Sequence, residues 1–488
     1  MTIIGAGLAG CEAALQCAKR GVPVRLFEMR PEKMTEAHET GDVAELVCSN
    51  SLKSDEPENA HGLLKAELRV LGSALLECAE RARIPGGKAL VVDRRRFSFE
   101  VQSALTRAGI EVTRQEVTSP AAGVMSSEVE ISLSYGETLQ RATLAQGDKN
   151  ESVVIVATGP LTSQSMAEAL QALLGTGHLF FYDAIAPIVT AESLDMTRVF
   201  EGSRYEAGSD YLNCPMSEDE YGRFVDALLG AELHPLHDFE KPQFFEGCLP
   251  VEEIARRGRL ALAFGPMKPV GLIDPRTGRQ PFAVVQLRRE NEAGAMHNLV
   301  GFQTRLTYPE QERVFRLIPG LEQTKFLRLG SIHRNTYLDA PKVLLPTLQT
   351  RVRADLFIAG QLAGVEGYVE SIGAGLVAGI NAARLAKGGQ PLELPAETML
   401  GSLLRHITSP ASDSSLECGS AAPALALPPG KAAAPQPQSK AFQPMNANYG
   451  LLPPLAERLR GRDKRRAMAE RALAGARGFA STIPHNPA

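Results

Sequence analysis

The sequence predicts an α/β protein in which a nucleotide-binding domain is interrupted by a smaller inserted domain. The chain opens with a short apolar run, three spaced glycines and a helical segment. Apolar runs that end in small-residue turns recur at 152–159 and 355–360, and such runs are typical of central parallel strands. Between them, from about residue 195, prolines, aromatics and turn signals increase, which indicates an insertion.

The first motif is Gly5-x-Gly7-x-x-Gly10, which follows residues 2–4 and opens a helix. In a Rossmann-like unit the first glycine permits a tight turn, the second lets the backbone approach a pyrophosphate, and the third allows close helix packing. Glu28 ends the next apolar run, 18 positions beyond Gly10, roughly where a ribose-binding acid is expected. The motif therefore predicts a bound adenine dinucleotide, contacted by Gly5, Ala6, Gly7, Leu8, Ala9, Gly10 and Glu28. The opening strand is short, which is consistent with a start a few residues upstream of Met1.

One such motif suits NAD and FAD equally, but two later turns favour FAD. Thr158 and Gly159 end the strand at 152–159, and Gly360 ends the strand at 355–360. We expect the last helix to open at Gly373 and Gly375 and to direct its N-terminus towards the flavin or the diphosphate. The sequence has no second GxGxxG with a downstream acid, so a nicotinamide that reduces the flavin would bind without its own Rossmann unit.

The domain organisation follows from these changes in composition. A stretch at 111–145 alternates weakly and predicts a β-meander over the cofactor, and the Pro-, Ala- and Ser-rich stretch after residue 408 predicts disorder. We expect five segments: a Rossmann-like FAD-binding domain, first part (1–194); an inserted smaller α/β domain (195–325); the closing part of the FAD-binding domain (326–408); a disordered insertion or tether (409–441); and a basic C-terminal helical tail (442–488).

Composition favours a cytoplasmic enzyme. No apolar run reaches the ~18 residues that span a bilayer, which argues against a membrane protein. Seven cysteines without a CxxC pair argue against zinc and against a disulfide framework. The net charge is −4, yet eight basic and three acidic residues give the stretch 451–488 a charge of +5. Its Lys464-Arg465-Arg466 cluster is either a contact for nucleic-acid phosphates or a solvated helix face.

Besides the glycine motif, the chain contains several further distinctive blocks. With that motif they are Gly5–Gly10, Val47-Cys48-Ser49-Asn50-Ser51, Cys214-Pro215-Met216, Phe245-Glu246-Gly247-Cys248-Leu249-Pro250, Gly301-Phe302-Gln303-Thr304, Gly364–Ser371 and Phe442–Pro454. Together they resemble the folate- and FAD-dependent tRNA uracil-5-methyltransferases, the TrmFO family. The likeness covers residues 1 to about 477 except 409–440, and the glycine motif and the 364–371 block are shared with the wobble-uridine GidA/MnmG enzymes.

The resemblance implies 5,10-methylenetetrahydrofolate as carbon donor, FAD reduced by NAD(P)H, and 5-methyluridine at position 54 of the tRNA T-loop as product. Uracil C5 is a poor nucleophile until a group adds to C6, which a thiolate does well. We expect Cys214 to attack C6 from a loop that swings over the flavin. We expect Cys48 to remove the C5 proton or to assist at the flavin face. Polar residues in segments that resemble the folate cleft are Arg288, Asn291, Gln303, His333, Arg334 and Asn335.

Three other functions remain open at this point. A GidA/MnmG-like wobble-uridine enzyme would carry a long helical C-terminal domain, whereas this chain ends in a tether and one basic helix. An FAD-dependent dehydrogenase of a small metabolite would need neither Cys214 nor RNA. A non-catalytic flavin-binding RNA chaperone has no sequence feature in its favour. The sequence leaves the oligomeric state open, with a monomer the preferred interpretation.

Overall fold

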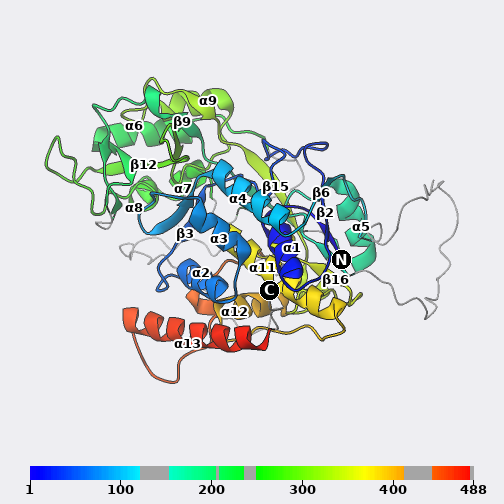
Figure 1. Cartoon of the computed structure of the whole chain (residues 1–488). Helices are drawn as coiled ribbons and strands as arrows, with labels where there is room; N and C mark the ends of the chain where they lie inside the picture. Colours follow the sequence, from blue (N-terminus) through cyan, green and yellow to red (C-terminus); the bar gives the residue numbers. More distant parts are fainter. Residues whose placement is uncertain are drawn as a thin grey trace.

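The computed structural model of the chain describes residues 1–120, 153–177, 179–204, 208–235, 244, 249–410 and 442–483. Figure 1 shows three regions side by side: a parallel sheet with helices near the middle, a second sheet with its own helices at one end, and a long C-terminal helix at the other. Residues 121–145 of the expected β-meander (111–145) and residues 411–441 of the expected tether (409–441) lie outside the described residues.

The first sheet is parallel throughout and has the order β16-β7-β1-β2-β6. The chain builds it outward from the central strand β1, first to one side and then to the other. In open α/β sheets, ligands bind where the order reverses, at the carboxyl ends of the strands, which here is the junction of β1 and β7. The strands are β1 (Thr2–Ile4), β2 (Arg25–Glu28), β6 (Val112–Arg114), β7 (Val154–Val156) and β16 (Leu356–Ile358).

Two helices, α1 (Leu8–Lys19) and α11 (Tyr368–Ala386), pack closely against each other beside this sheet. The approach is so close that a Cβ on Gly375 would lie 2.2 Å from the carbonyl oxygen of Ala9. The other elements of this region are β3 (Ser51–Ser54), α2 (Ala60–Val70), α3 (Ala74–Arg81), β4 (Arg83–Ile84), β5 (Ala89–Val92), α4 (Arg94–Arg107), α5 (Gln164–Leu174), α10 (Ala340–Val343), η5 (Gly360–Ala363) and α12 (Met399–Thr408).

The second sheet is antiparallel, with the order β10-β11-β12-β13-β9-β14. One face packs on helices to form a separate apolar core that contains Phe224, Phe302 and Phe315. The elements are β9 (Ile188–Thr190), η2 (Ala191–Ser193), β10 (Phe200–Glu201), β11 (Tyr211–Met216), α6 (Glu218–Leu229), α7 (Val251–Arg256), α8 (Ala261–Phe264), β12 (Ala283–Arg289), β13 (Met296–Leu299), α9 (Tyr308–Phe315) and β14 (Phe326–Arg328).

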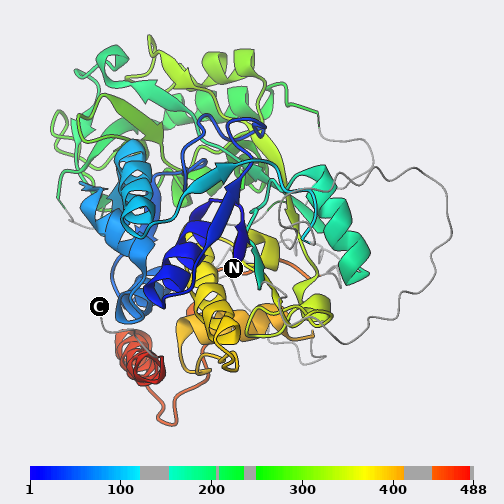
Figure 2. The ribbon, with the colours of Figure 1, turned by 45° about the vertical axis from the view of Figure 1, so that its right-hand side comes forward.

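An antiparallel ribbon of β8 (Leu179–Ala184) and β15 (Ile332–Tyr337) flanks the second sheet in the chain, β8 before its first strand and β15 after its last. Towards the C-terminus, η6 (Tyr449–Leu451) precedes α13 (Gly461–Thr482). Both views place α13 on the outside of the molecule next to α2, on the side away from the second sheet (Figures 1 and 2).

Three expectations from the sequence differ from this fold. The β-meander expected from residue 111 is wrong at its start, because residues 112–114 form β6, which pairs in parallel with β2. The second sheet takes strands from 188 to 328, so it reaches beyond the expected 195–325 on both sides. The expectation that the last helix opens at Gly373 is wrong, because α11 already begins at Tyr368 after Gly367, whose φ is 117°. The small residues that suggested a turn lie inside the helix, where they permit its contact with α1.

Candidate functional site

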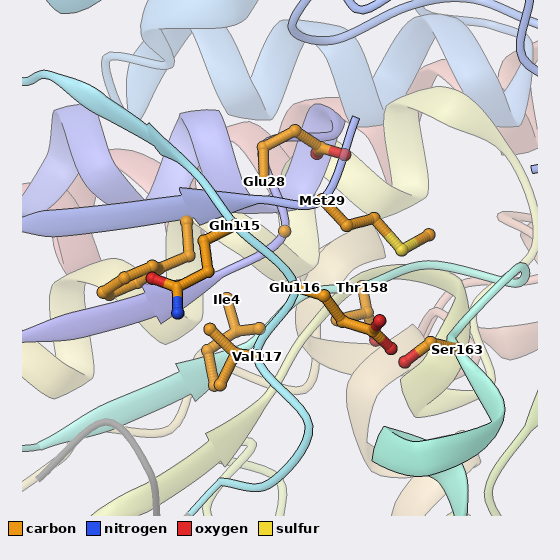
Figure 3. Close-up of a pocket in the computed structure, with 10 residues that line it drawn as sticks. Ile4, Glu28, Met29, Gln115, Glu116, Val117, Thr158 and Ser163 are labelled. Atoms are coloured by element: carbon orange, nitrogen blue, oxygen red, sulfur yellow. The ribbon is translucent and has the colours of Figure 1, made fainter. Parts of the chain in front are cut away.

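A pocket lies at the carboxyl ends of β1, β2 and β7, at the reversal of strand order (Figure 3). Its walls combine backbone from the first glycine turn with polar side chains from three segments. Figure 3 shows Glu28 and Met29 on one side and Glu116, Thr158 and Ser163 on the other. The complete lining is Ile4, Gly5, Phe27, Glu28, Met29, Gln115, Glu116, Val117, Thr158 and Ser163.

Glu28 ties the end of β2 to the glycine turn. Its Oε2 accepts a hydrogen bond from the Ala6 amide at 2.9 Å, and its Oε1 accepts one from Arg30 Nε at 2.9 Å. Arg30 also donates to Glu45 Oε2 at 2.9 Å. Burial alone would raise the pKa of Glu28, but the Arg30 charge and the hydrogen bonds from Arg30 and Ala6 outweigh it and hold the pKa below its usual value. The carboxyl group is therefore ionised at neutral pH, where it can accept hydrogen bonds from ribose hydroxyls.

The glycines of the first motif have the environments that a dinucleotide requires. Gly5 has a φ of 99°, and a Cβ on Gly10 would lie 1.8 Å from the Gly5 carbonyl oxygen, so the helix meets the turn closely. A Cβ on Gly7 would meet nothing within 4 Å, which leaves open space next to the first turn of α1 (Leu8 and Ala9), where its free N–H groups lie. Gly159 is equally open. These residues fit a bound dinucleotide.

The late glycines divide into two groups. Gly360 begins η5 with a φ of 75°. A Cβ on Gly360 would lie 2.9 Å from the Cβ of Ala9, so Gly360 lies next to the first glycine turn. Gly373 and Gly375 are buried inside α11, against Leu400 and Ala9 respectively. The expectation that they form a turn at a helix N-terminus is thus wrong for both residues, because their lack of a side chain serves packing between helices.

A second group of polar residues surrounds Cys48, which precedes β3. Three arginines hold the segment from residue 46 to 50. Arg94 Nη1 donates to the carbonyl oxygens of residues 46 and 47, Arg328 Nη1 donates to that of residue 47 at 2.9 Å, and Arg288 donates to Ser49 Oγ at 2.9 Å and to Asn50 Oδ1 at 2.8 Å. Arg94 comes from α4, whereas Arg288 and Arg328 come from the second sheet. The Cys48 segment therefore lies where the two halves of the molecule meet.

The Cys48 thiol lies 2.9 Å from the hydroxyl oxygen of Tyr368, the first residue of α11. Burial, followed by the carboxylate of Asp183, raises the pKa of Cys48 to about 12, and the hydrogen bond to Tyr368 opposes this shift. Burial and Asp183 also raise the pKa of Glu366 well above its usual value. A partly buried thiol, a phenol and acids with shifted pKa values in one place are the features of a reaction site.

Cys214 is not part of this group, and the expectation that it lies on a loop near the flavin is wrong for this structure. It is in the middle of β11, fully buried in the core of the second sheet. Side chains alternate along a strand, so Cys214 points to the face opposite Tyr211, and Tyr211 pairs with Arg288. Because Arg288 reaches Ser49, the Cys214 thiol faces away from the Cys48 segment. Burial raises the pKa of Cys214 far above its usual value.

The other polar residues expected in the cleft have different positions. Arg288 contacts the Cys48 segment, and His333 on β15 lies opposite Asp183, with a pKa lowered to about 4 by burial and then by Arg328 and His38. Asn291 instead closes a turn by accepting from the amide of residue 295. The three remaining residues have other neighbours. Arg334 stacks on Phe180, the Gln303 carbonyl accepts from the Val251 amide, and Asn335 is buried on β15 opposite Phe181.

Residue-level reasoning from the sequence missed Tyr368, Arg94 and Asp183. Tyr368 and Glu366 belong to the Gly364–Ser371 block, in which Gly364 and Gly367 both have positive φ values, so paired glycines around a tyrosine were the available signal. Arg94 and Asp183 carried no motif. Within the described residues, several buried polar atoms of this region have no hydrogen-bond partner, which leaves them free for a ligand: Arg94 Nη2, Glu290 Oε1, Asn298 Nδ2 and His333 Nδ1.

The fold and the pocket at the strand reversal define a dinucleotide-binding α/β protein, and comparison with known proteins narrows this class. The profile of the GidA family, described as "Glucose inhibited division protein A", matches residues 1–390. The structure of Aquifex aeolicus GidA aligns with a TM-score of 0.60 at 17% identity, over 83% of this chain and 67% of that one. That likeness supports the fold.

Within that class, the chain belongs to the TrmFO family. Two relatives named "Methylenetetrahydrofolate--tRNA-(uracil-5-)-methyltransferase TrmFO" are each 51% identical to it. The one from Heliobacterium modesticaldum matches over 97% of this chain and 96% of its own length. The one from Geobacter sulfurreducens matches over 99% of both.

The described residues also bear on two other classes of site. None of the helices in those ranges is both long and apolar enough to cross a membrane. The same ranges contain no group of three or more His, Cys, Asp or Glu side chains arranged to hold a metal ion.

Proposed function

We propose that this protein is a methylenetetrahydrofolate-dependent tRNA (uracil-5-)-methyltransferase that uses FAD. The names of relatives that are 51% identical over nearly the whole chain support the reaction class. The structural observation that supports the proposal is the Cys48–Tyr368 pair, which lies where the two sheets meet. Methylation at uracil C5 needs a thiol or another base close to the ring.

Residues at the strand reversal would hold the FAD. The first turn of α1 directs free N–H groups towards the diphosphate, and Gly7 leaves room for it. Glu28 would accept hydrogen bonds from the ribose, and Thr158 and Gly159 would line the opposite wall. When bound and reduced by NAD(P)H, the flavin supplies the electrons that convert the one-carbon unit of the folate into a methyl group.

We assign to Cys48 the role of the general base that acts on the uracil ring. Its sulfur would accept the proton released from uracil C5, and the electron pair of that C–H bond would form an enolate with the C4 carbonyl of the ring. Burial disfavours the thiolate form, so the reaction depends on neighbours that stabilise negative charge on sulfur. Arg94, Arg288 and Arg328 fix the segment that carries Cys48, so the thiol is held in position before the substrate arrives.

For the tRNA, we propose docking of the T-arm on the N-terminal end of α13, with uridine 54 as the target. The basic triplet, Lys464, Arg465 and Arg466, is exposed there. Arg462 Nε pairs with Glu58 at 2.8 Å, which joins α13 to the loop before α2. From α2, His61 reaches Glu370 at 3.0 Å, two residues from Tyr368. The basic triplet is thus linked through contacts to the Cys48 region. We propose that a monomer acts in this way, in the cytoplasm.

The decisive experiment combines the purified protein, FAD, NADPH, methylenetetrahydrofolate and unmodified tRNA, and measures 5-methyluridine by mass spectrometry of digested RNA. We expect product at position 54 that depends on the folate and not on S-adenosylmethionine, and no product from C48A. A control variant, C78A, removes a different buried thiol, on α3, and should retain activity. Modification at the wobble position alone, or activity that persists in C48A, would refute the proposal.

A further inference from the structure

The hydroxyl group of Tyr368 has three neighbours on the Cys48 segment. Its oxygen lies 2.9 Å from the Cys48 amide nitrogen, 3.2 Å from the Ser49 amide nitrogen and 2.9 Å from Cys48 Sγ. Tyr368 follows Gly367, whose φ of 117° is a backbone conformation that favours glycine. The turn before α11 therefore directs this side chain towards the Cys48 sulfur and the backbone amides of Cys48 and Ser49.

The donors and acceptors around the Tyr368 hydroxyl determine the direction of its hydrogen bond with Cys48 Sγ. A backbone N–H can only donate, and a phenol has two acceptor lone pairs and one hydrogen. The two amides occupy both acceptor positions of the Tyr368 oxygen. Among the described residues, Cys48 Sγ is the acceptor left for the remaining hydrogen, so the tyrosine is the donor and the sulfur is the acceptor.

We propose that Tyr368 is a positioning residue that donates its hydroxyl hydrogen to Cys48 Sγ and so stabilises the thiolate form of Cys48. A hydrogen bond to a charged group is stronger than one to its neutral form, so donation favours S⁻ over S–H. The use of this thiolate in catalysis rests on the function proposed above. The hydrogen bond and its effect on the thiol do not.

The charges around Cys48 explain why such a donor is needed. Burial disfavours the thiolate, and the carboxyl groups of Asp183 on β8 and Glu366 before α11 add repulsion. Arg94 on α4 is the cation that opposes them. Burial, followed by the negative charge of an ionised Cys48, raises the pKa of Tyr368 well above its usual value, so the phenol keeps the hydrogen that it donates at any pH at which the enzyme works.

The test measures the reactivity of Cys48 in the purified full-length protein, without folate or tRNA. A small aromatic disulfide labels the thiol, and mass spectrometry of the peptide that contains Cys48 gives the rate at each pH from 7 to 10. Loss of a hydrogen bond to a charged group would lower the thiolate fraction about 10- to 100-fold. The thiolate that remains has a higher pKa and is more nucleophilic, which offsets roughly half of this loss on a logarithmic scale. We therefore expect Y368F to react about 3- to 10-fold more slowly at each pH.

The control is Y337F, which also removes a phenol hydroxyl, one that donates to the backbone of residue 442 at 3.1 Å. It should leave the Cys48 rate unchanged. A second variant carries 3-fluorotyrosine at position 368. Its more acidic hydroxyl is a better donor, so the rate profile should shift in the opposite direction to that of Y368F, which a purely structural role would not produce.

The proposal is overturned if Y368F reacts as fast as the unaltered protein, if Y337F slows labelling equally, or if fluorotyrosine produces no shift. Failure of the proposed methylation would be seen separately. If the protein makes no 5-methyluridine but shows both rate shifts, the proposed Tyr368–Cys48 hydrogen bond stands and only its role in methylation is rejected.

Discussion

Replacement of Glu28 by glutamine should weaken both the fold and cofactor binding, because one carboxylate serves three partners. Glu28 accepts from the Ala6 amide, the Arg30 amide and Arg30 Nε, and the side chains of Glu28 and Arg30 are only 7% and 3% exposed. Glutamine has one acceptor oxygen, and its amide group would face one of these donors. The variant thus removes the ion pair and leaves at least one buried N–H without a partner.

The size of the effect follows from the burial of this pair. Removing one member of a buried ion pair typically lowers the free energy of unfolding by about 3–5 kcal/mol. Glu45 remains as a second carboxylate for Arg30, which places the expected loss for E28Q near the lower end, about 3 kcal/mol.

The pH dependence has a definite sign. The pKa of Glu28 is lowered in the folded protein, so its contribution is present above the unfolded value of about 4.3 and is lost as the pH falls through the folded pKa. The difference in stability between the unaltered protein and E28Q should therefore be constant from pH 7 to 5 and shrink below about pH 4.

Urea unfolding at several pH values and FAD titration by flavin fluorescence measure the two effects. The control is D226N, which alters an exposed pair with Arg259, and we expect no measurable change in either quantity. A stability difference that stays constant down to pH 3 would show that the charge of Glu28 is not what stabilises the fold. FAD affinity equal to that of the unaltered protein would exclude Glu28 from the ribose site.

The remaining predictions concern packing, thiol access and tRNA. G375A places a methyl group 2.2 Å from the Ala9 carbonyl oxygen and should abolish soluble, flavin-loaded protein, whereas G478A, which meets nothing within 4 Å in α13, should be tolerated in thermal unfolding. Without tRNA, Cys214 should react with iodoacetamide far more slowly than Cys48, and equal rates would contradict the burial of Cys214. If Cys214 attacks C6, added tRNA should accelerate the labelling of Cys214. Replacing the basic triplet with alanine should weaken tRNA binding and reduce the slope of log K against log salt by about 2–3, and an unchanged slope would place the tRNA elsewhere.

The nucleotide-binding part of the fold was predictable because its signals are local. Four of the five strands of the parallel sheet lie in short apolar runs, whereas β6 (Val112–Arg114) is mostly polar and was not predicted as part of it. The turn after β1 contains glycines whose spacing is set by one helix and one phosphate. Glu28 could be placed for the same reason, since it ends a strand at a fixed distance from those glycines. The helix start was predicted wrongly because glycine has two uses, in turns and in close helix contacts, and the pattern around Gly373 does not distinguish them.

The geometry around the cysteines could not be read from the sequence, because it depends on the register of strands far apart in the chain. Cys48 and Cys214 occur in equally polar surroundings in the sequence. Only the pairing of β11 with β12 determines that Cys214 faces the apolar core while Arg288 faces the Cys48 segment. Tyr368, 320 residues from Cys48 in the chain, reaches it through the packing of α11.

This register limits how Cys214 could take part in the reaction. Its thiol lies in the same apolar core as Tyr221 and Phe224 of α6, on the face away from the Cys48 segment. A rigid rotation of the second sheet towards the nucleotide-binding domain would bring Arg288 closer and leave Cys214 covered. It would also strain the contacts that Arg288 and Arg328 of the second sheet make with the Cys48 segment. Access to Cys214 therefore requires β11 to separate from α6, or its side chains to exchange faces by a one-residue shift in register. Either change disrupts the apolar core, so only a partner that binds with a large free energy, such as tRNA, could drive it.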